Sequence, residues 1–107
     1  MSETSNKNKI DMHQQICREL TEIYRKKNSA YGDSFALLRA EVPNAILVRI
    51  FDKYSRLKNL LNNSSDREVK QYEKDESIED TLKDLANYCI MELVERQTKN
   101  KTSPVGE

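Results

Sequence analysis

The sequence predicts an all-α fold: a helical bundle of three long helices joined by short helical turns. Apolar residues recur at i, i+3, i+4 and i+7 spacing along three stretches, and no stretch alternates as a strand does. Only two glycines and two prolines interrupt the 107 residues, and charged residues make up 34% of them. This composition is typical of a helix-rich chain that forms one domain.

The first long helix is expected over residues 10–27, where Ile16, Leu20, Ile23 and Tyr24 share one face. Residues 28–34 break it. They include Gly32, which suggests a backbone conformation that other residues resist. One or two short helical turns follow over residues 35–40.

The second long helix is expected over residues 43–61, with Pro43 at its first position. With Asp52 set at zero on a helical wheel, one apolar stripe lies between about 120° and 220°. Its members are Ile46, Leu47, Ile50, Tyr54, Leu57 and Leu61.

The third helix is expected over residues 77–97, with Ser77 as its N-cap. With Asp80 at zero, an apolar stripe lies between about 140° and 220°, and the opposite stripe carries acids. The apolar members are Ile78, Leu82, Leu85, Cys89 and Leu93. The second and third long helices are therefore both expected to turn their apolar stripes toward the core.

One domain is expected over residues 9–97, between disordered polar tails at 1–8 and 98–107, with residues 62–75 as a solvated connection. Helices of this number and length bury only a thin core. We therefore expect the bundle to be completed by self-association into a homodimer or homotetramer built on helix faces.

The net charge and the apolar runs exclude two classes of partner. A formal net charge of zero gives no basic field that would bind duplex nucleic acid. No apolar run reaches the length of a membrane span, and no signal peptide is recognisable, so no membrane partner is expected. Cys17 and Cys89 fit small buried hydrophobes of a cytoplasmic protein.

Acidic residues form the first candidate site. Asp80 and Asp84 are four residues apart and lie one above the other on a helix, where like charges repel. A Mg²⁺ ion would reverse that effect. Asp52 on the preceding helix would supply a third carboxylate, and Glu76 and Glu79 are near enough to join. The alternative is structural: Asp80 helps to cap the helix, and Asp84 pairs with Arg56 or Lys53.

Basic residues form the second candidate site. Arg49, Lys53 and Arg56 follow one another at one-turn spacing on the second long helix. Beside a phosphate they would act as charge clamps. The alternative, which spacing alone favours, is a set of ordinary surface or intersubunit ion pairs.

The loop after the first helix is the third candidate. Tyr31 or Phe35 would stack on a nucleobase, and Ser34 would bond a base edge or a phosphate. The alternative is an aromatic anchor that pins the loop to the core.

Three blocks of the sequence, KNSAYGDSF at 27–35, RIFDKYSRL at 49–57 and ESIEDTLKDLANY at 76–88, resemble the nucleotide modification associated domain 1 family. That family is common among small phage and prophage proteins. It is in turn similar to the MazG and dimeric dUTPase group of all-α nucleoside triphosphate pyrophosphohydrolases. Those enzymes hold Mg²⁺ on acids in the patterns ExxE and ExxD of neighbouring helices.

The chain departs from that pattern at two positions. Asp84 resembles the final acid, but Asp80 lies four residues before it, and Thr81 stands at the three-residue position. On the preceding helix Asp52 is the one acid offered, and Arg56 stands where another acid is expected. The chain therefore has fewer metal ligands than the pattern requires.

The resemblance implies a Mg²⁺-dependent (d)NTP pyrophosphohydrolase that acts on the nucleotide pool in the cytoplasm of a bacterial host. A non-catalytic binder that sequesters a nucleotide or a nucleotide-derived signal is the alternative. An interaction protein whose polar stripes make intersubunit salt bridges is the third hypothesis. The implied roles are catalysis by Asp80 and Asp84, metal binding by Asp52, Glu79, Asp80 and Asp84, phosphate binding by Arg49, Lys53 and Arg56, and base or sugar binding by Tyr31, Ser34 and Asn87.

Overall fold

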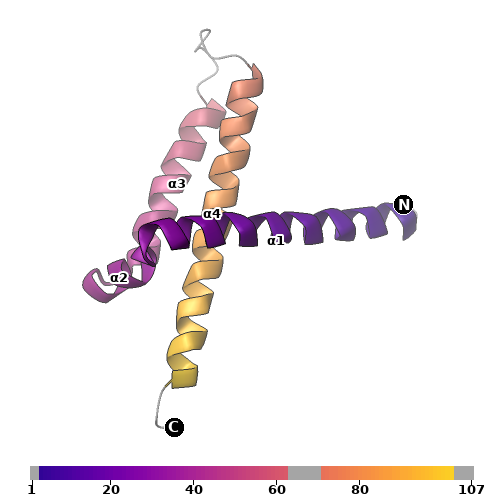
Figure 1. Cartoon of the computed structure of the whole chain (residues 1–107). Coiled ribbons are helices and arrows are strands. Elements are labelled where there is room, and N and C mark those ends of the chain that lie inside the picture. Colours follow the sequence, from indigo (N-terminus) through magenta and orange to yellow (C-terminus); the bar gives the residue numbers. More distant parts are fainter. Residues whose placement is uncertain (1–2, 63–70, 103–107) are drawn as a thin grey trace. The chain divides into compact units, whose positions relative to one another are not determined.

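A computed structural model describes residues 3–62 and 71–102 (Figure 1). This part of the chain forms four helices and no strand, so the predicted all-α class is confirmed. The helices are α1 (Glu3–Tyr31), α2 (Ser34–Glu41), α3 (Ala45–Asn62) and α4 (Gln71–Thr102). They divide into two units, Met1–Ser34 and Phe35–Glu107, and each unit is described by itself.

Helix α1 makes up the first unit and is longer than expected. It begins at Glu3, inside the segment 1–8 for which the composition predicted no fixed structure. Adding residues to a helix that already exists is far easier than starting one, so polar residues extend it. The helix ends where Gly32 and Asp33 adopt φ angles of 62° and 59°, and the Gly32 N–H donates to the Asn28 carbonyl at 3.0 Å. The prediction of a special backbone conformation at Gly32 is confirmed.

A tight turn joins α2 to α3. The Val42 N–H donates to the Leu38 carbonyl at 2.8 Å and closes α2. The expectation that Pro43 opens the second long helix is wrong, because α3 begins at Ala45. Asn44 stands between them with a φ of 57°, a left-handed conformation that Asn tolerates and that no continuous helix contains.

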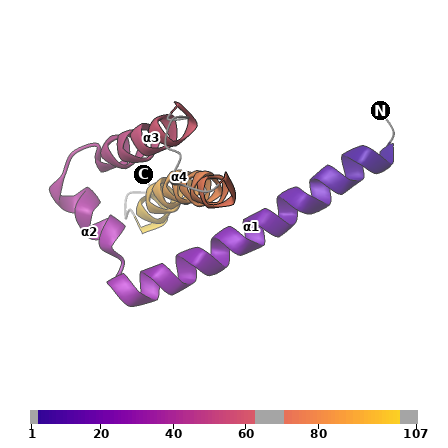
Figure 2. The same cartoon turned by 90° about the horizontal axis from the view of Figure 1, so that it is seen from above.

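Helices α3 and α4 form an antiparallel hairpin, and Figures 1 and 2 show them side by side. Arg49 contacts Tyr88, Lys53 contacts Asp84, and Arg56 contacts Thr81. From one contact to the next, the residue number rises by four and then by three along α3 and falls by four and then by three along α4. This is the register of an antiparallel pair. We call this line of three contacts the seam.

Both ends of α4 lie beyond the expected bounds. The helix begins at Gln71, whose side-chain amide donates to Asp75 at 2.9 Å, and Glu73 in the first turn favours the helix dipole. Ser77 is therefore not the N-cap but lies inside the helix. At the other end the helix reaches Thr102, inside the predicted tail 98–107. No described helix is both long and apolar enough to span a membrane.

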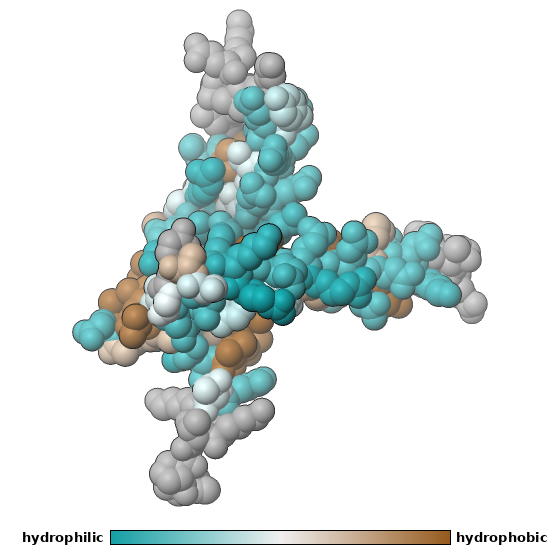
Figure 3. Space-filling model, in the orientation of Figure 1, coloured by the Kyte–Doolittle hydropathy of each residue, from teal (hydrophilic) through white to brown (hydrophobic). Residues whose placement is uncertain are grey.

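Apart from one aromatic residue, Phe35, the interior of the second unit contains polar and small residues. Its buried residues are Phe35, Ala45, Thr81, Asn87 and Glu92. The expectation that the apolar stripes of both helices face the core is wrong for six of their eleven members, because one hairpin cannot bury both its seam and its apolar stripes. The exposed members are Leu47, Tyr54, Leu61, Leu82, Cys89 and Leu93. Figure 3 shows hydrophobic residues at the surface over α2 and over the C-terminal half of α4.

Candidate functional site

Lys53 and Asp84 lie opposite each other in the seam. The Lys53 ammonium is 3.3 Å from a carboxylate oxygen of Asp84, and the two side chains are 25% and 28% exposed. The structural alternative for Asp84, an ion pair with a cation of the preceding helix, is therefore present. Both groups remain within reach of solvent and of a ligand.

Arg56 and Thr81 form the next contact of the seam. The Arg56 Nε donates to the Thr81 hydroxyl at 3.2 Å, and this hydroxyl donates to the Ser77 carbonyl at 2.7 Å. Thr81 is 2% exposed, so its hydroxyl is held inside the hairpin and offers the Arg56 guanidinium an acceptor there. These are the two positions where the chain departs from the pyrophosphohydrolase pattern, and they contact each other.

Among the residues that the structure describes, no acid pairs with the charge of Arg56. Within the described residues, the hydrogen bond to Thr81 is the one recorded for Arg56, and a hydroxyl carries no charge. A guanidinium has five N–H donors in a rigid plane, so donors remain for an anion. Where the pattern has two acids, this chain places a cation held by a neutral group.

Arg49 begins the seam. Its guanidinium lies 3.5 Å from an Asp52 carboxylate oxygen and 5.8 Å from the centre of the Tyr88 ring. The Tyr88 ring meets Phe35 edge to face at 5.7 Å. Phe35 is 5% exposed and packs against Tyr88, so it acts as the aromatic anchor that we weighed against base stacking.

The acids predicted to bind Mg²⁺ do not gather in this chain. Glu79, Asp80 and Asp52 are exposed, while Asp84 pairs with Lys53. The register of the hairpin offsets the backbone positions of Asp52 and Asp80 by about 7.5 Å along the helix axis. In the described part of the chain, no three His, Cys, Asp or Glu side chains are close enough to hold a metal ion. Within residues 3–62 and 71–102 of one copy, the acids expected to bind Mg²⁺ are therefore not gathered into one site.

The residues expected to hold a base or sugar belong to both units. Ser34 is the exposed first residue of α2 and is the last residue of the first unit. The side chain of Tyr31 lies outside the described residues. Asn87 belongs to the second unit, where it is 8% exposed and interacts with other groups.

Sequence reasoning missed a cluster of charges between α2 and α4. Glu92 is 8% exposed and accepts hydrogen bonds from Arg39 at 2.8 and 3.0 Å and from Arg96 at 2.6 Å. The bonds from Arg39 lower the pKa of Glu92 to about 2 against the opposing effect of burial, and Arg96 adds to the lowering. The same contact raises the pKa of Arg39. The four-residue spacing of Glu92 and Arg96 on one helix indicates that they form an ion pair. Nothing in the sequence indicates that Arg39 joins them.

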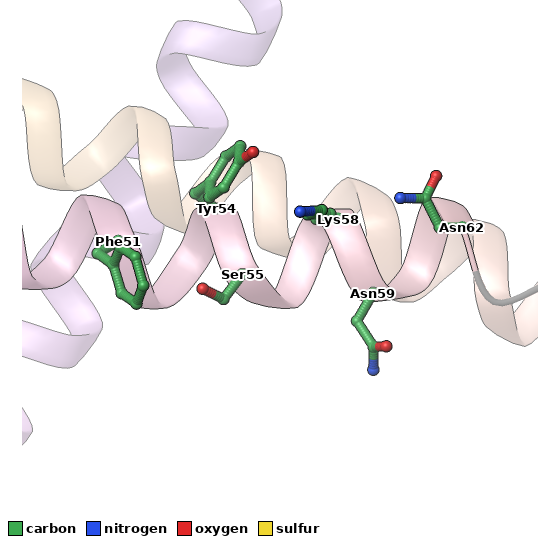
Figure 4. A pocket seen from close by; sticks show the side chains of 6 residues that line it. All are labelled: Phe51, Tyr54, Ser55, Lys58, Asn59 and Asn62. Carbon is green, nitrogen blue, oxygen red and sulfur yellow. The ribbon is translucent and has the colours of Figure 1, made fainter.

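A shallow recess of about 470 Å³ lies along α3, away from the seam (Figure 4). One helix supplies the whole lining, so the recess is an open helix face rather than a cleft. Its residues are Phe51, Tyr54, Ser55, Lys58, Asn59 and Asn62. None of these residues was expected to bind a ligand.

Comparison with known proteins gives one match. A family model described as nucleotide modification associated domain 1 matches residues 27–95, which is more than half of the chain. No curated protein and no solved structure matches the chain. The matched range contains the whole seam and the three sequence blocks quoted above.

Proposed function

The chain belongs to the nucleotide modification associated domain 1 family, and from this premise we propose that it binds a nucleotide through its phosphates at the seam of α3 and α4. Arg56 carries the proposal. Its guanidinium is positioned by the buried hydroxyl of Thr81, and its charge lacks an acidic partner among the described residues. A phosphate supplies that charge and matches the planar donors of the guanidinium.

Lys53 is the second phosphate ligand in this proposal. It lies one turn before Arg56 on α3, and its bond to Asp84 is longer than a strong charge-assisted hydrogen bond. A phosphate group brings more negative charge than one carboxylate and competes for the ammonium. Arg49 extends the row of cations by one more turn, while Asn87 is the candidate within the same unit for holding the base or sugar.

Binding in this form does not need a metal ion. The described acids of one copy form no group of three, and the guanidinium of Arg56 would itself neutralise phosphate charge. The protein would then sequester a nucleotide or a nucleotide-derived signal in the cytoplasm of a bacterium that carries a phage or prophage encoding this chain.

Mg²⁺-dependent pyrophosphohydrolysis of (d)NTPs, as in the MazG-like enzymes, is the second candidate. The observation in its favour is that Asp80 and Asp84 share one stripe of α4 beside the row of cations. It requires a rearrangement that gathers Asp52, Glu79, Asp80 and Asp84, or acids from another copy. We also propose that the protein works as a homo-oligomer, for which a surface is derived below.

Titration calorimetry of each canonical NTP and dNTP in the presence of EDTA tests the proposal. We expect wild-type protein to bind at least one of them and to release it intact. Arg56→Gln and Lys53→Gln should each weaken binding about tenfold or more, since a hydrogen bond to a charged group contributes about 1.5–3 kcal/mol. Lys58→Gln is the matched control, because it removes the same charge from the opposite face of α3.

Two outcomes decide between the candidates. Unchanged affinity in both Arg56→Gln and Lys53→Gln would contradict phosphate binding at the seam. Release of nucleoside monophosphate and pyrophosphate on addition of Mg²⁺, abolished in Asp84→Asn, would replace sequestration with hydrolysis.

A further inference from the structure

The apolar stripes of α3 and α4 lie on the same side of the hairpin. On the two helical wheels defined above, the seam lies near 70° on both helices, and both stripes lie roughly 100° further in the same rotational sense. In an antiparallel pair, equal rotation away from the contact line brings residues to one common side. The same geometry places Asp52 and Asp80 on the opposite side of the hairpin, at different heights along it.

Six side chains define this apolar face. They are Leu47, Tyr54 and Leu61 of α3 and Leu82, Cys89 and Leu93 of α4. Each of them is exposed, with the five large ones between 47% and 62% accessible. None is charged, which distinguishes the apolar face from the seam and from the acidic side.

We infer that the apolar face packs against the apolar face of a second copy of this chain. The inference gives a surface to the self-association proposed above and does not rest on nucleotide binding. Two hairpins joined in this way form a four-helix bundle, whose core is the pair of apolar faces.

The size of the apolar face fits this occupant. At about 100 Å² of accessible surface for each of six side chains, one copy presents roughly 600 Å². Two copies together would then bury about 1,200 Å², the lower bound for a specific and stable interface. The net charge of zero adds no repulsion between identical copies.

The spacing of the apolar face is self-complementary. Leu47, Tyr54 and Leu61 follow one another at seven-residue intervals, with Tyr54 at the centre. A two-fold axis through Tyr54 sets Leu47 of one antiparallel α3 beside Leu61 of the other, as a closed dimer requires. A helix with unequal spacing would not match its own copy in this way.

The recess in Figure 4 supplies the border of the interface. Tyr54 and Phe51 lie at one end of it, and polar side chains continue from them along α3. The polar members are Ser55, Lys58, Asn59 and Asn62. Aromatic residues next to a polar rim are the usual composition of a protein interface.

Two neighbouring residues give a matched test. Leu47 belongs to the apolar face and is 62% exposed, while Val48 is 47% exposed and lies on the acidic side of α3. We expect sedimentation equilibrium to give wild-type protein twice the chain mass of 12.5 kDa. Leu47→Lys should raise the dissociation constant of the pair about a hundredfold or more, and Val48→Lys should leave it unchanged.

Other outcomes overturn the inference. Wild-type protein with the mass of one chain would contradict the inference directly. Equal effects of Leu47→Lys and Val48→Lys, or no effect of either, would exclude this face as the interface. If circular dichroism shows that Leu47→Lys does not fold, Leu61→Lys at the other end of the stripe gives the same reading. Calorimetry in EDTA on the dissociated variant shows separately whether nucleotide binding persists.

Discussion

Replacing Glu92 with Gln should destabilise the protein strongly at neutral pH and should remove part of its acid sensitivity. Glu92 accepts two hydrogen bonds from Arg39 and one from Arg96 in a position that is 8% exposed. Gln keeps the size of the side chain but removes its charge. The variant would therefore leave Arg39, whose side chain is 27% exposed, facing a neutral amide.

The magnitude follows from the pKa of Glu92. Chiefly the hydrogen bonds from Arg39 lower this pKa from 4.5 to about 2. One pKa unit corresponds to 1.36 kcal/mol, so the shift is equivalent to at most about 3 kcal/mol of folding free energy. Because the pKa is lowered in the folded state, this stability is fully present above pH 4.5 and is lost as the pH falls toward 2.

Urea unfolding followed by circular dichroism, at one fixed protein concentration, measures the effect. At pH 7 we expect Glu92→Gln to lower the free energy of unfolding by about 2–3 kcal/mol, which is a large part of the stability of a small domain. Between pH 4.5 and 3 the wild-type protein should lose more stability than the variant.

Glu79→Gln is the matched control, since Glu79 is an exposed acid of the same helix. Its unfolding free energy should stay within about 0.5 kcal/mol of the wild-type value. If Glu92→Gln matched that control at pH 7, or if both variants lost stability in acid as the wild type does, the reasoning on Glu92 would be refuted.

Three more substitutions test other contacts by urea unfolding. Phe35→Ala should cost about 3–5 kcal/mol because it empties the buried site against Tyr88, and a loss below 1 kcal/mol would contradict the anchor role. Thr81→Val should cost about 1–3 kcal/mol and should also weaken nucleotide binding, since Arg56 loses the acceptor that positions it; full retention of both would count against the seam. Gly32→Ala should cost about 1 kcal/mol through its φ of 62° alone, because no atom lies within 4 Å of the added carbon; a stabilising effect would contradict this.

The all-α class could be predicted because it depends on local patterns. The apolar spacing around Leu20 and Ile50, together with the scarcity of glycine and proline, is enough to predict helices. Helix ends were less predictable. The start of α3 depends on the left-handed Asn44, which a search for apolar spacing does not detect.

The sequence did not determine which face of each helix is covered or which residues of α3 and α4 contact each other. A helical wheel shows that Tyr54 and Leu82 lie on apolar stripes, but it does not show whether the same chain covers them. In the structure both remain exposed, and the seam contains Lys53 and Asp84 instead. A helical wheel placed the candidate ligand residues on one stripe of each helix. Which residues of the other helix they contact is determined by the register of the hairpin, which only the structure shows.

The central claim is that a nucleotide phosphate binds Arg56 without a metal ion. The side-chain Nε–H resonance of Arg56 in a ¹⁵N correlation spectrum reports on this group directly, because that N–H is the donor to Thr81. Titration with the nucleotide found by calorimetry, in EDTA, should shift this resonance in a saturable manner and leave that of the exposed Arg18 unchanged. An Arg56 resonance that stays in place, or that moves only after Mg²⁺ is added, would contradict the claim.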